Sequence, residues 1–248
     1  MVLRYLEPQP SNVTWVHGDI LDQNTMDRVL EDHEIDKIVH AAVYSATRED
    51  IERFESRRIV SINMEGTANM LELARKAQVA RFVYVSLVGV YEGLGSQGET
   101  LIEGTPLHPR QLYNATKYAS ELITHRCGEA HGFEAAVARL GGPYGLMERA
   151  TGHQVVMSTL HQWTGKAVRG ETIDAETEDY WDFTYVLDIA AGIRTVLDAP
   201  SLTHEAYNLN RGVQVSAQEL VSAFREATPS ANINLRTGND TDMPQSSS

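Results

Sequence analysis

The amino-acid sequence predicts a doubly wound α/β fold, in which a parallel sheet is covered by helices on both faces, with a smaller lobe near the C-terminus. Short β-rich runs alternate along the chain with helical patterns, and most of these runs are largely apolar. Such strands are typical of parallel sheets, which are buried on both faces and need helical crossovers. With 248 residues, 42% of them hydrophobic, the chain is long enough for one domain or for a large and a small lobe.

The first part of the chain carries the alternation most clearly. Apolar, β-branched runs predict strands, and the segments between them have the spacing of amphipathic helices. We therefore assign residues 1–145 to the main sheet region. Strands are expected at 13–16, 37–40, 81–86 and 134–140, and helices at 26–33, in a long stretch ending at Gln78, and around Tyr113.

The pattern becomes less regular after residue 145. Residues 146–236 are predicted to form the smaller lobe, with some elements returning to the main sheet. The polar segment 237–248 is expected to be a frayed tail. Helices are predicted near 153–165, 188–199 and 216–227, and a short strand at 206–210.

Composition excludes several classes of function. The formal net charge of −13 makes the surface repel nucleic acids and anionic membranes. The single cysteine, Cys127, rules out an internal disulfide framework and suits a reducing cytosol. The Cys/His spacing of a metal site is absent, and no apolar stretch approaches the ~20 residues of a membrane helix. We therefore expect a soluble cytoplasmic protein without a metal.

A formal Gly-x-Gly-x-x-Gly pattern occurs at residues 93–98, directly after the strand RFVYVSLVGVY. Glycines in that pattern can let the backbone approach a pyrophosphate, which then rests on the N-terminus of the next helix. Here the following residues, ETLIEGTPLHPR, contain two prolines and a glycine and predict an irregular loop. The motif therefore is expected to be a surface loop.

A second pattern, Tyr113-x-x-x-Lys117, lies in the segment QLYNATKYASELI. Side chains four residues apart share one face of a helix. An ammonium group close to a phenol can lower the pKa of that phenol by about 1–3 units, which would make the pair an acid–base device. The alternative is an ordinary amphipathic helix with the tyrosine packed inward and the lysine in solvent.

Eight segments, in order along about residues 13–225, resemble motifs of the extended short-chain dehydrogenases, the NAD-dependent epimerase/dehydratase family. Each motif is weak alone, and their order and spacing carry the resemblance. It implies a Rossmann-like dinucleotide-binding region at 1–145 and a substrate lobe at 146–236. The segments are HGDILD (17–22), VHAA (39–42), INMEGTANMLELA (62–74), YVSLVGVYEG (84–93), YNATK (113–117), RLGGPYG (139–145), DFTYVLDIA (182–190) and YNLNRG (207–212).

The resemblance implies hydride transfer between a substrate carbinol carbon and NAD or NADP. Tyr113 would remove or return the hydroxyl proton, and Lys117 would hold the nicotinamide ribose and lower the phenol's pKa. Homodimerisation through the Tyr113 helix and the helix before it is also expected from the family. The remaining cofactor-binding residues that it implies are Asp19, Ile20, Ala41, Ala42, Asn63 and Pro143.

Some of these residues have structural alternatives. Asp19 at a strand end can simply cap the next turn, and Asn63 can bond neighbouring backbone instead of a ligand. His40 is as well explained as a satisfied, half-buried histidine. The small side chains of Ala41 and Ala42 suit a position beside a flat cofactor.

The sequence also departs from the family. The N-terminal strand with its Gly-rich phosphate-binding turn is missing, so the sheet is expected to be truncated or rearranged and cofactor affinity to be impaired. The position of the family's catalytic Ser or Thr holds Leu87, and Ser86 replaces it only if the strand end is displaced by one residue. Among the residues that concern the substrate, Trp181 and Gly142 stand where an Arg and an Asn are usual, and the stretch ETIDAETED just before Trp181 disfavours a sugar nucleotide.

The sequence therefore predicts an NAD(P)-dependent epimerase, dehydratase or dehydrogenase acting on a small hydroxy or keto compound or a sugar-derived substrate. One alternative is a non-catalytic family member that serves as a dinucleotide sensor or interaction module. Another is an inactive fragment of a longer protein.

Overall fold

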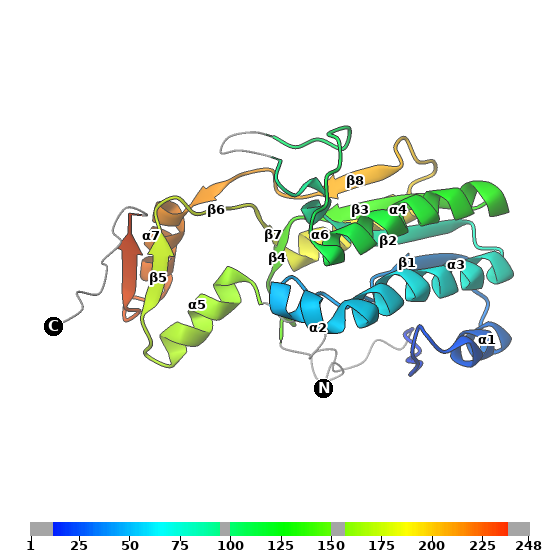
Figure 1. Ribbon diagram of the computed structural model, residues 1–248, viewed down its shortest axis with the longest axis horizontal. Coiled ribbons are helices and arrows are strands. Elements are labelled where there is room, and N and C mark those ends of the chain that lie inside the picture. Colours follow the sequence, from blue (N-terminus) through cyan, green and yellow to red (C-terminus); the bar gives the residue numbers. More distant parts are fainter. Residues whose placement is uncertain (1–11, 95–99, 150–156, 238–248) are drawn as a thin grey trace.

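The computed structural model describes residues 12–94, 100–149 and 157–237. Its centre is a four-stranded sheet in the order β1-β2-β3-β8, and every pairing in it is parallel. Figure 1 shows these strands side by side, with α3 and α4 in front of them. The predicted parallel α/β sheet is therefore confirmed. Its strands are β1 (Lys37–His40), β2 (Arg81–Leu87), β3 (Glu134–Leu140) and β8 (Ala206–Leu209).

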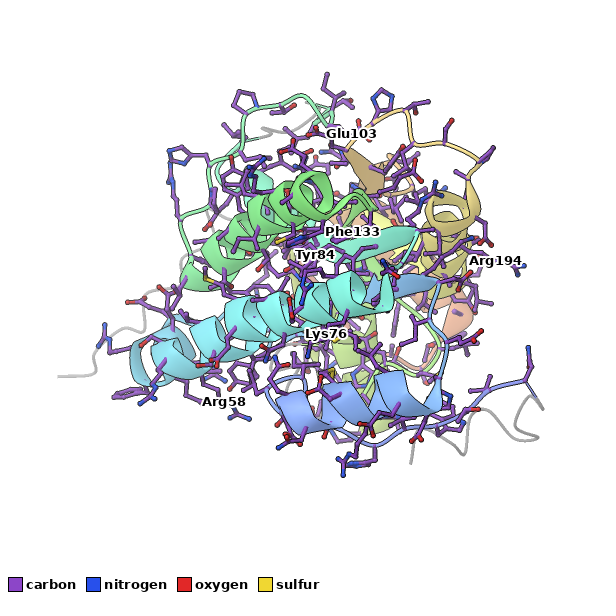
Figure 2. All side chains as sticks on the ribbon, turned by 90° about the vertical axis from the view of Figure 1, so that its right-hand side faces the viewer. Arg58, Lys76, Tyr84, Glu103, Phe133 and Arg194 are labelled. Carbon is purple, nitrogen blue, oxygen red and sulfur yellow. The ribbon has the colours of Figure 1, made fainter. Side chains whose placement is uncertain are left out.

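Alternation along β2 explains why both faces of the sheet need helices. Phe82 and Tyr84 point to one face and pack with Leu71 of α3 and with Phe133. Val83 points to the other face and packs with Val196 of α6. Figure 2 shows Tyr84 and Phe133 in the interior beside α3 and α4, whereas Lys76 and Arg194 lie at the outside.

The helices around this sheet begin and end close to the predicted positions. The long stretch before Gln78 is interrupted by one π-helical turn, η2 (Ser61–Glu65), in which the N–H of Gly66 donates to the carbonyl of Ser61. Gln78, with a φ of 52°, ends α3 in the left-handed conformation. The helices are α1 (Gln23–Asp32), α2 (Glu49–Val60), α3 (Gly66–Ala77), α4 (Leu112–His131) and α6 (Val186–Asp198).

The C-terminal elements form a second, smaller core, drawn at the left of Figure 1. Buried residues of this core include Trp163, Ile173 and Val221. Three two-stranded sheets hold it together, and β4 and β7 connect it to the carboxyl end of β3 and to α6. Its elements are β4 (Gly142–Tyr144), α5 (Thr159–Val168), β5 (Ile173–Glu176), β6 (Tyr180–Trp181), β7 (Phe183–Tyr185), β9 (Val215–Ser216), α7 (Ala217–Ala227) and β10 (Ile233–Arg236), together with the short 3-10 helix η3 (Val88–Tyr91) after β2.

One predicted strand is wrong. Residues 13–16 form no strand, and Val13, Trp15 and Val16 are exposed. Their β propensity is real, but a strand forms only against a neighbour, and within the described residues β1 pairs with β2 alone.

Other predictions fall partly outside the described residues. The helix expected near 153–165 begins at Thr159, and residues 150–156 are not described. Most of the glycine pattern at 93–98 and the tail at 238–248 also lie outside the described residues. Within the described ranges, no helix is both long and apolar enough to cross a membrane.

Candidate active site

The site predicted from the sequence lies at the carboxyl edge of the main sheet. Because all four strands are parallel, their carboxyl ends meet at one edge, which is where open α/β sheets bind ligands. Helix α4 connects β2 to β3 and therefore starts at this edge. Its first turn contains Tyr113, and Lys117 follows one turn later.

Two carboxylates hold the beginning of α4. Glu92 Oε2 accepts hydrogen bonds from the backbone N–H groups of Arg110 (2.7 Å) and Gln111 (2.9 Å), and Glu52 Oε2 accepts one from Leu112 (3.1 Å). The first N–H groups of a helix have no partner within the helix, and negative charge there is favourable. These bonds fix where the first turn of α4, and with it Tyr113, stands.

Lys117 is buried, with only 3% of its surface exposed. Its Nζ donates to the backbone carbonyl of Val85 (2.6 Å) and lies 4.2 Å from the ring centroid of Tyr84. Burial lowers the pKa of Lys117 to about 7, and the charge of Glu121 opposes this shift. The interpretation of an amphipathic helix with a solvated lysine is therefore wrong.

Tyr113 is also buried, at 7% exposure. Burial raises the pKa of its phenol to about 12, whereas the sequence predicted a lowered pKa. That expectation is wrong for this structure, because the Lys117 ammonium is directed to Val85 and Tyr84 rather than to the phenol. The phenol therefore keeps its proton at neutral pH.

Ser86 lies next to the backbone carbonyl that Lys117 contacts. It is 3% exposed, and its Oγ is buried without a hydrogen-bond partner. The register of β2 with β3 is regular from Arg81 to Leu87, so the strand end is not displaced. Alternation then puts Ser86 on the same face as Tyr84, the face that α3 and α4 cover. An unpaired buried hydroxyl is uncommon and calls for an explanation.

Asn63 joins the long helix to α4. Its side chain accepts from the N–H of Tyr44 (2.9 Å) and donates to the carbonyl of Tyr44 and to Thr116 Oγ1 (both 3.2 Å). Its backbone carbonyl accepts from the hydroxyls of Thr67 (2.6 Å) and Ser120 (3.0 Å). Asn63 is thus a structural link beside Lys117, in agreement with the alternative that it bonds neighbouring groups.

Two other predicted residues lie in the loop before α1. Asp19 is exposed, and its Oδ1 accepts from the N–H of Leu21 (2.9 Å), which matches the turn-capping alternative. The side chain of Ile20 packs on α3, where a Cβ added to Gly66 would lie 2.4 Å from Ile20 Cδ1. The glycine therefore allows this loop to approach α3.

The remaining predicted positions lie at the strand ends. Ala41 and Ala42 follow β1 and are exposed, and Pro143 is exposed on β4. His40 is fully inside, with its Nε2 3.1 Å from Thr67 Oγ1, so it is a satisfied buried histidine. Burial, together with the nearby charge of Lys117, lowers the pKa of His40 to about 4.

A buried polar network next to the site was not predicted from the sequence. Arg139 on β3 makes a bidentate ion pair with Glu121 on α4 (Nη2–Oε2, 2.8 Å), and both side chains are buried. Arg139 Nη1 also donates to Tyr91 Oη (2.7 Å), which in turn donates to Asn208 on β8 (3.1 Å). A charged residue inside the apolar run EAAVARL was the available signal, because a buried arginine requires a partner.

A family model described as the NAD dependent epimerase/dehydratase family matches residues 3–210. The chain belongs to this family. It is a distant relative of UDP-glucose 4-epimerases and dTDP-D-glucose 4,6-dehydratases.

The UDP-glucose 4-epimerase of Halalkalibacterium halodurans is 28% identical over 239 residues, covering 88% of this chain and 68% of that protein. The human dTDP-D-glucose 4,6-dehydratase is 25% identical over 248 residues, covering 95% of this chain and 68% of that protein. This family member therefore spans about two thirds of the length of these relatives.

The fold of the chain is also that of solved family structures. The crystal structure of the UDP-glucose 4-epimerase of Thermus thermophilus, a complex with NAD, superposes with a TM-score of 0.78 at 22% identity. The match covers 96% of this chain and 76% of that one. The Rossmann-like sheet and the small C-terminal lobe are thus the fold of this family.

Proposed function

We propose that the chain is an NAD(P)-dependent oxidoreductase of the epimerase/dehydratase type, acting on a sugar-derived or other small hydroxy or keto substrate. The observation that supports this most directly is the buried pair Tyr113 and Lys117 at the carboxyl edge of the sheet, beside the unpartnered Ser86 hydroxyl. Family membership and the nucleotide-sugar relatives support the reaction type and the substrate class.

The residues at this edge fit the nicotinamide end of such a cofactor. Ser86 Oγ is a buried hydroxyl without a partner, and the exposed Ala41 and Ala42 leave room beside the end of β1. Lys117 would hold ribose hydroxyls after turning away from Val85. Within the described residues, no glycine-rich turn leads from a strand of the sheet directly into a helix, so no residue is proposed for the diphosphate.

Tyr113 is the residue that would transfer the proton. A bound nicotinamide supplies the acceptor or donor of hydride, and Tyr113 Oη gives a proton to the substrate oxygen or takes one from it. The raised pKa, about 12, keeps the phenol protonated, which is the form that donates a proton to a carbonyl oxygen. Removal of a hydroxyl proton requires an ionised phenol. The ammonium group of Lys117, one turn further along α4, would stabilise the negative charge of that phenolate.

Replacement of Tyr113 tests this proposal. Tyr113→Phe should lower turnover of UDP-glucose or dTDP-glucose by about 10²-fold or more, because the proton donor is lost. Binding of NADH, followed by nicotinamide fluorescence, and the unfolding midpoint should both be retained. Tyr118→Phe is the matched control, since Tyr118 is a half-buried tyrosine on the same helix.

Unchanged turnover in Tyr113→Phe would remove Tyr113 from the chemistry. NADH binding by the wild-type protein without hydride transfer to any sugar or carbonyl substrate would favour the non-catalytic alternative.

A homodimer through α4 and the long helical stretch before it, which includes α2, remains part of the proposal. Phe54 on α2 is 83% exposed and Leu122 on α4 is 54% exposed, and large exposed apolar side chains are common at interfaces. Sedimentation equilibrium should give twice the monomer mass, and Phe54→Glu should shift the protein towards monomer.

A further inference from the structure

A cavity of about 410 Å³ lies beyond β8, between the carboxyl end of that strand and the β4–β7 pair. Its volume lies within the range of about 300–1,000 Å³ that is typical of small-molecule sites. Tyr113, Lys117 and Ser86 do not line it, so it is separate from the proposed reaction centre. Aromatic residues (Tyr144, Phe183 and Tyr185) form one part of its lining, and polar residues (Asp188, Asn210 and Arg211) form another.

The aromatic part is a wall of packed rings. The Tyr144 ring centroid lies 5.9 Å from that of Phe183 and 5.6 Å from that of Tyr185. Gly145 has a φ of 125°, and a Cβ there would lie 2.6 Å from Tyr185 Cε2, so only glycine lets the chain pass beside this ring. The rings are therefore held in place and present a stable apolar surface to the cavity.

The polar part offers both donors and acceptors. Asp188 and Arg211 are exposed and carry opposite charges, so the lining has no net charge. Asn210 adds a side-chain amide to the lining, and its Oδ1 atom is buried close to Gly141 without a hydrogen-bond partner.

Hydrogen bonds of Asn208 hold the carboxyl end of β8, which leads into the polar part of the cavity lining. Its side chain accepts from Tyr91 Oη (3.1 Å), and its backbone N–H donates to Glu103 Oε1 (2.8 Å). Figure 2 shows Glu103 in the loop beside β8. A cavity whose wall and strand end are both fixed is preorganised for a ligand.

We infer that this cavity binds a neutral carbohydrate ring. The aliphatic face of such a ring packs on the aromatic wall, while its hydroxyls, each a donor and an acceptor, bond to Asp188, Arg211 and Asn210. A phosphorylated ligand suits the cavity less well, because its charge would lie beside Asp188 in a protein of net charge −13. A purely apolar ligand would leave the three polar side chains without new partners.

The probe is methyl α-D-glucopyranoside, titrated into the protein without cofactor and followed by saturation-transfer NMR and calorimetry. Saturable binding should occur, and Asp188→Ala and Arg211→Ala should each weaken it by about 10-fold, since each removes a charge-assisted hydrogen bond. Both side chains are exposed, so neither variant should unfold the protein. Asp32→Ala, at an exposed aspartate of α1, is the matched control and should bind like the wild type.

Three results would overturn this inference: no saturable binding, equal binding by the Asp188→Ala and wild-type proteins, or binding of uridine in place of the glucoside. The glucoside should also bind the Tyr113→Phe variant with unchanged affinity. The test uses neither cofactor nor turnover, so its outcome is independent of the proposed enzymatic function.

Discussion

The burial of Lys117 leads to a quantitative prediction of how the free energy of unfolding depends on pH. Replacing it with Met keeps an unbranched side chain of similar length and removes the ammonium that Val85 and Tyr84 contact. Burial lowers the lysine's pKa from 10.5 to about 7, so a charged Lys117 opposes folding at low pH. Relative to the wild type, the Lys117→Met variant should therefore gain most stability at and below pH 7. This gain should decrease as the pH rises.

The magnitude follows from the pKa shift. Between pH 7 and 10.5 the unfolded lysine keeps a proton that the native lysine has lost, so wild-type stability rises with pH relative to the variant. The change is about 1.4 kcal/mol per pH unit, or about 3 kcal/mol from pH 7 to pH 9. The loss of the hydrogen bond to Val85 and of the contact with Tyr84 changes the stability of the variant equally at pH 7 and at pH 9. It therefore does not alter this difference.

Urea unfolding at pH 6, 7, 8 and 9 measures the free energy of unfolding of both proteins. The stability difference between Lys117→Met and the wild type should be constant below pH 7 and then fall by about 3 kcal/mol up to pH 9. Lys166→Met, at a half-exposed lysine of α5, is the matched control for the loss of one lysine charge. Parallel stability curves for Lys117→Met and the wild type would refute the burial of a titrating lysine.

Two further predictions concern stability. Glu121→Gln leaves Arg139 buried without its counter-charge and should lower the free energy of unfolding by about 3–5 kcal/mol, as urea unfolding would show; a loss under 1 kcal/mol would mean that this pair is solvated. Ser216→Ala removes the capping box that Ser216 forms with Glu219 at the start of α7 and should cost about 1 kcal/mol, visible as a lower thermal midpoint, whereas Ser222→Ala within the same helix should have a smaller effect.

Much of the main sheet was predictable because its signals are local. The runs at 37–40 and 134–140 form strands with the predicted boundaries, and the strand predicted at 81–86 extends by one residue to Leu87. The run at 13–16 has similar local composition but forms no strand. The difference between these runs is the presence of a neighbouring strand, which a single segment of sequence does not contain.

The environment of the site was less predictable because it depends on distant segments. That Tyr113 and Lys117 share α4 follows from their spacing, but the direction of the lysine is set by the carbonyl of Val85 and the ring of Tyr84 on β2. The same holds for Arg139, whose partners come from α4 and from the turn after β2. Burial by segments far apart in the sequence set the directions of the pKa shifts of Tyr113 and Lys117.

The π-helical turn at Ser61–Glu65 has a consequence for how this chain tolerates change. A π turn holds one residue more than the α-helical path requires, so α2 and α3 meet there out of phase. Deleting one residue from the turn would leave two good helices but rotate one against the other by about 100°. Asn63 could then no longer reach Tyr44 and Thr116 together. The deletion would make the helix more regular, but it would also detach this helix from α4.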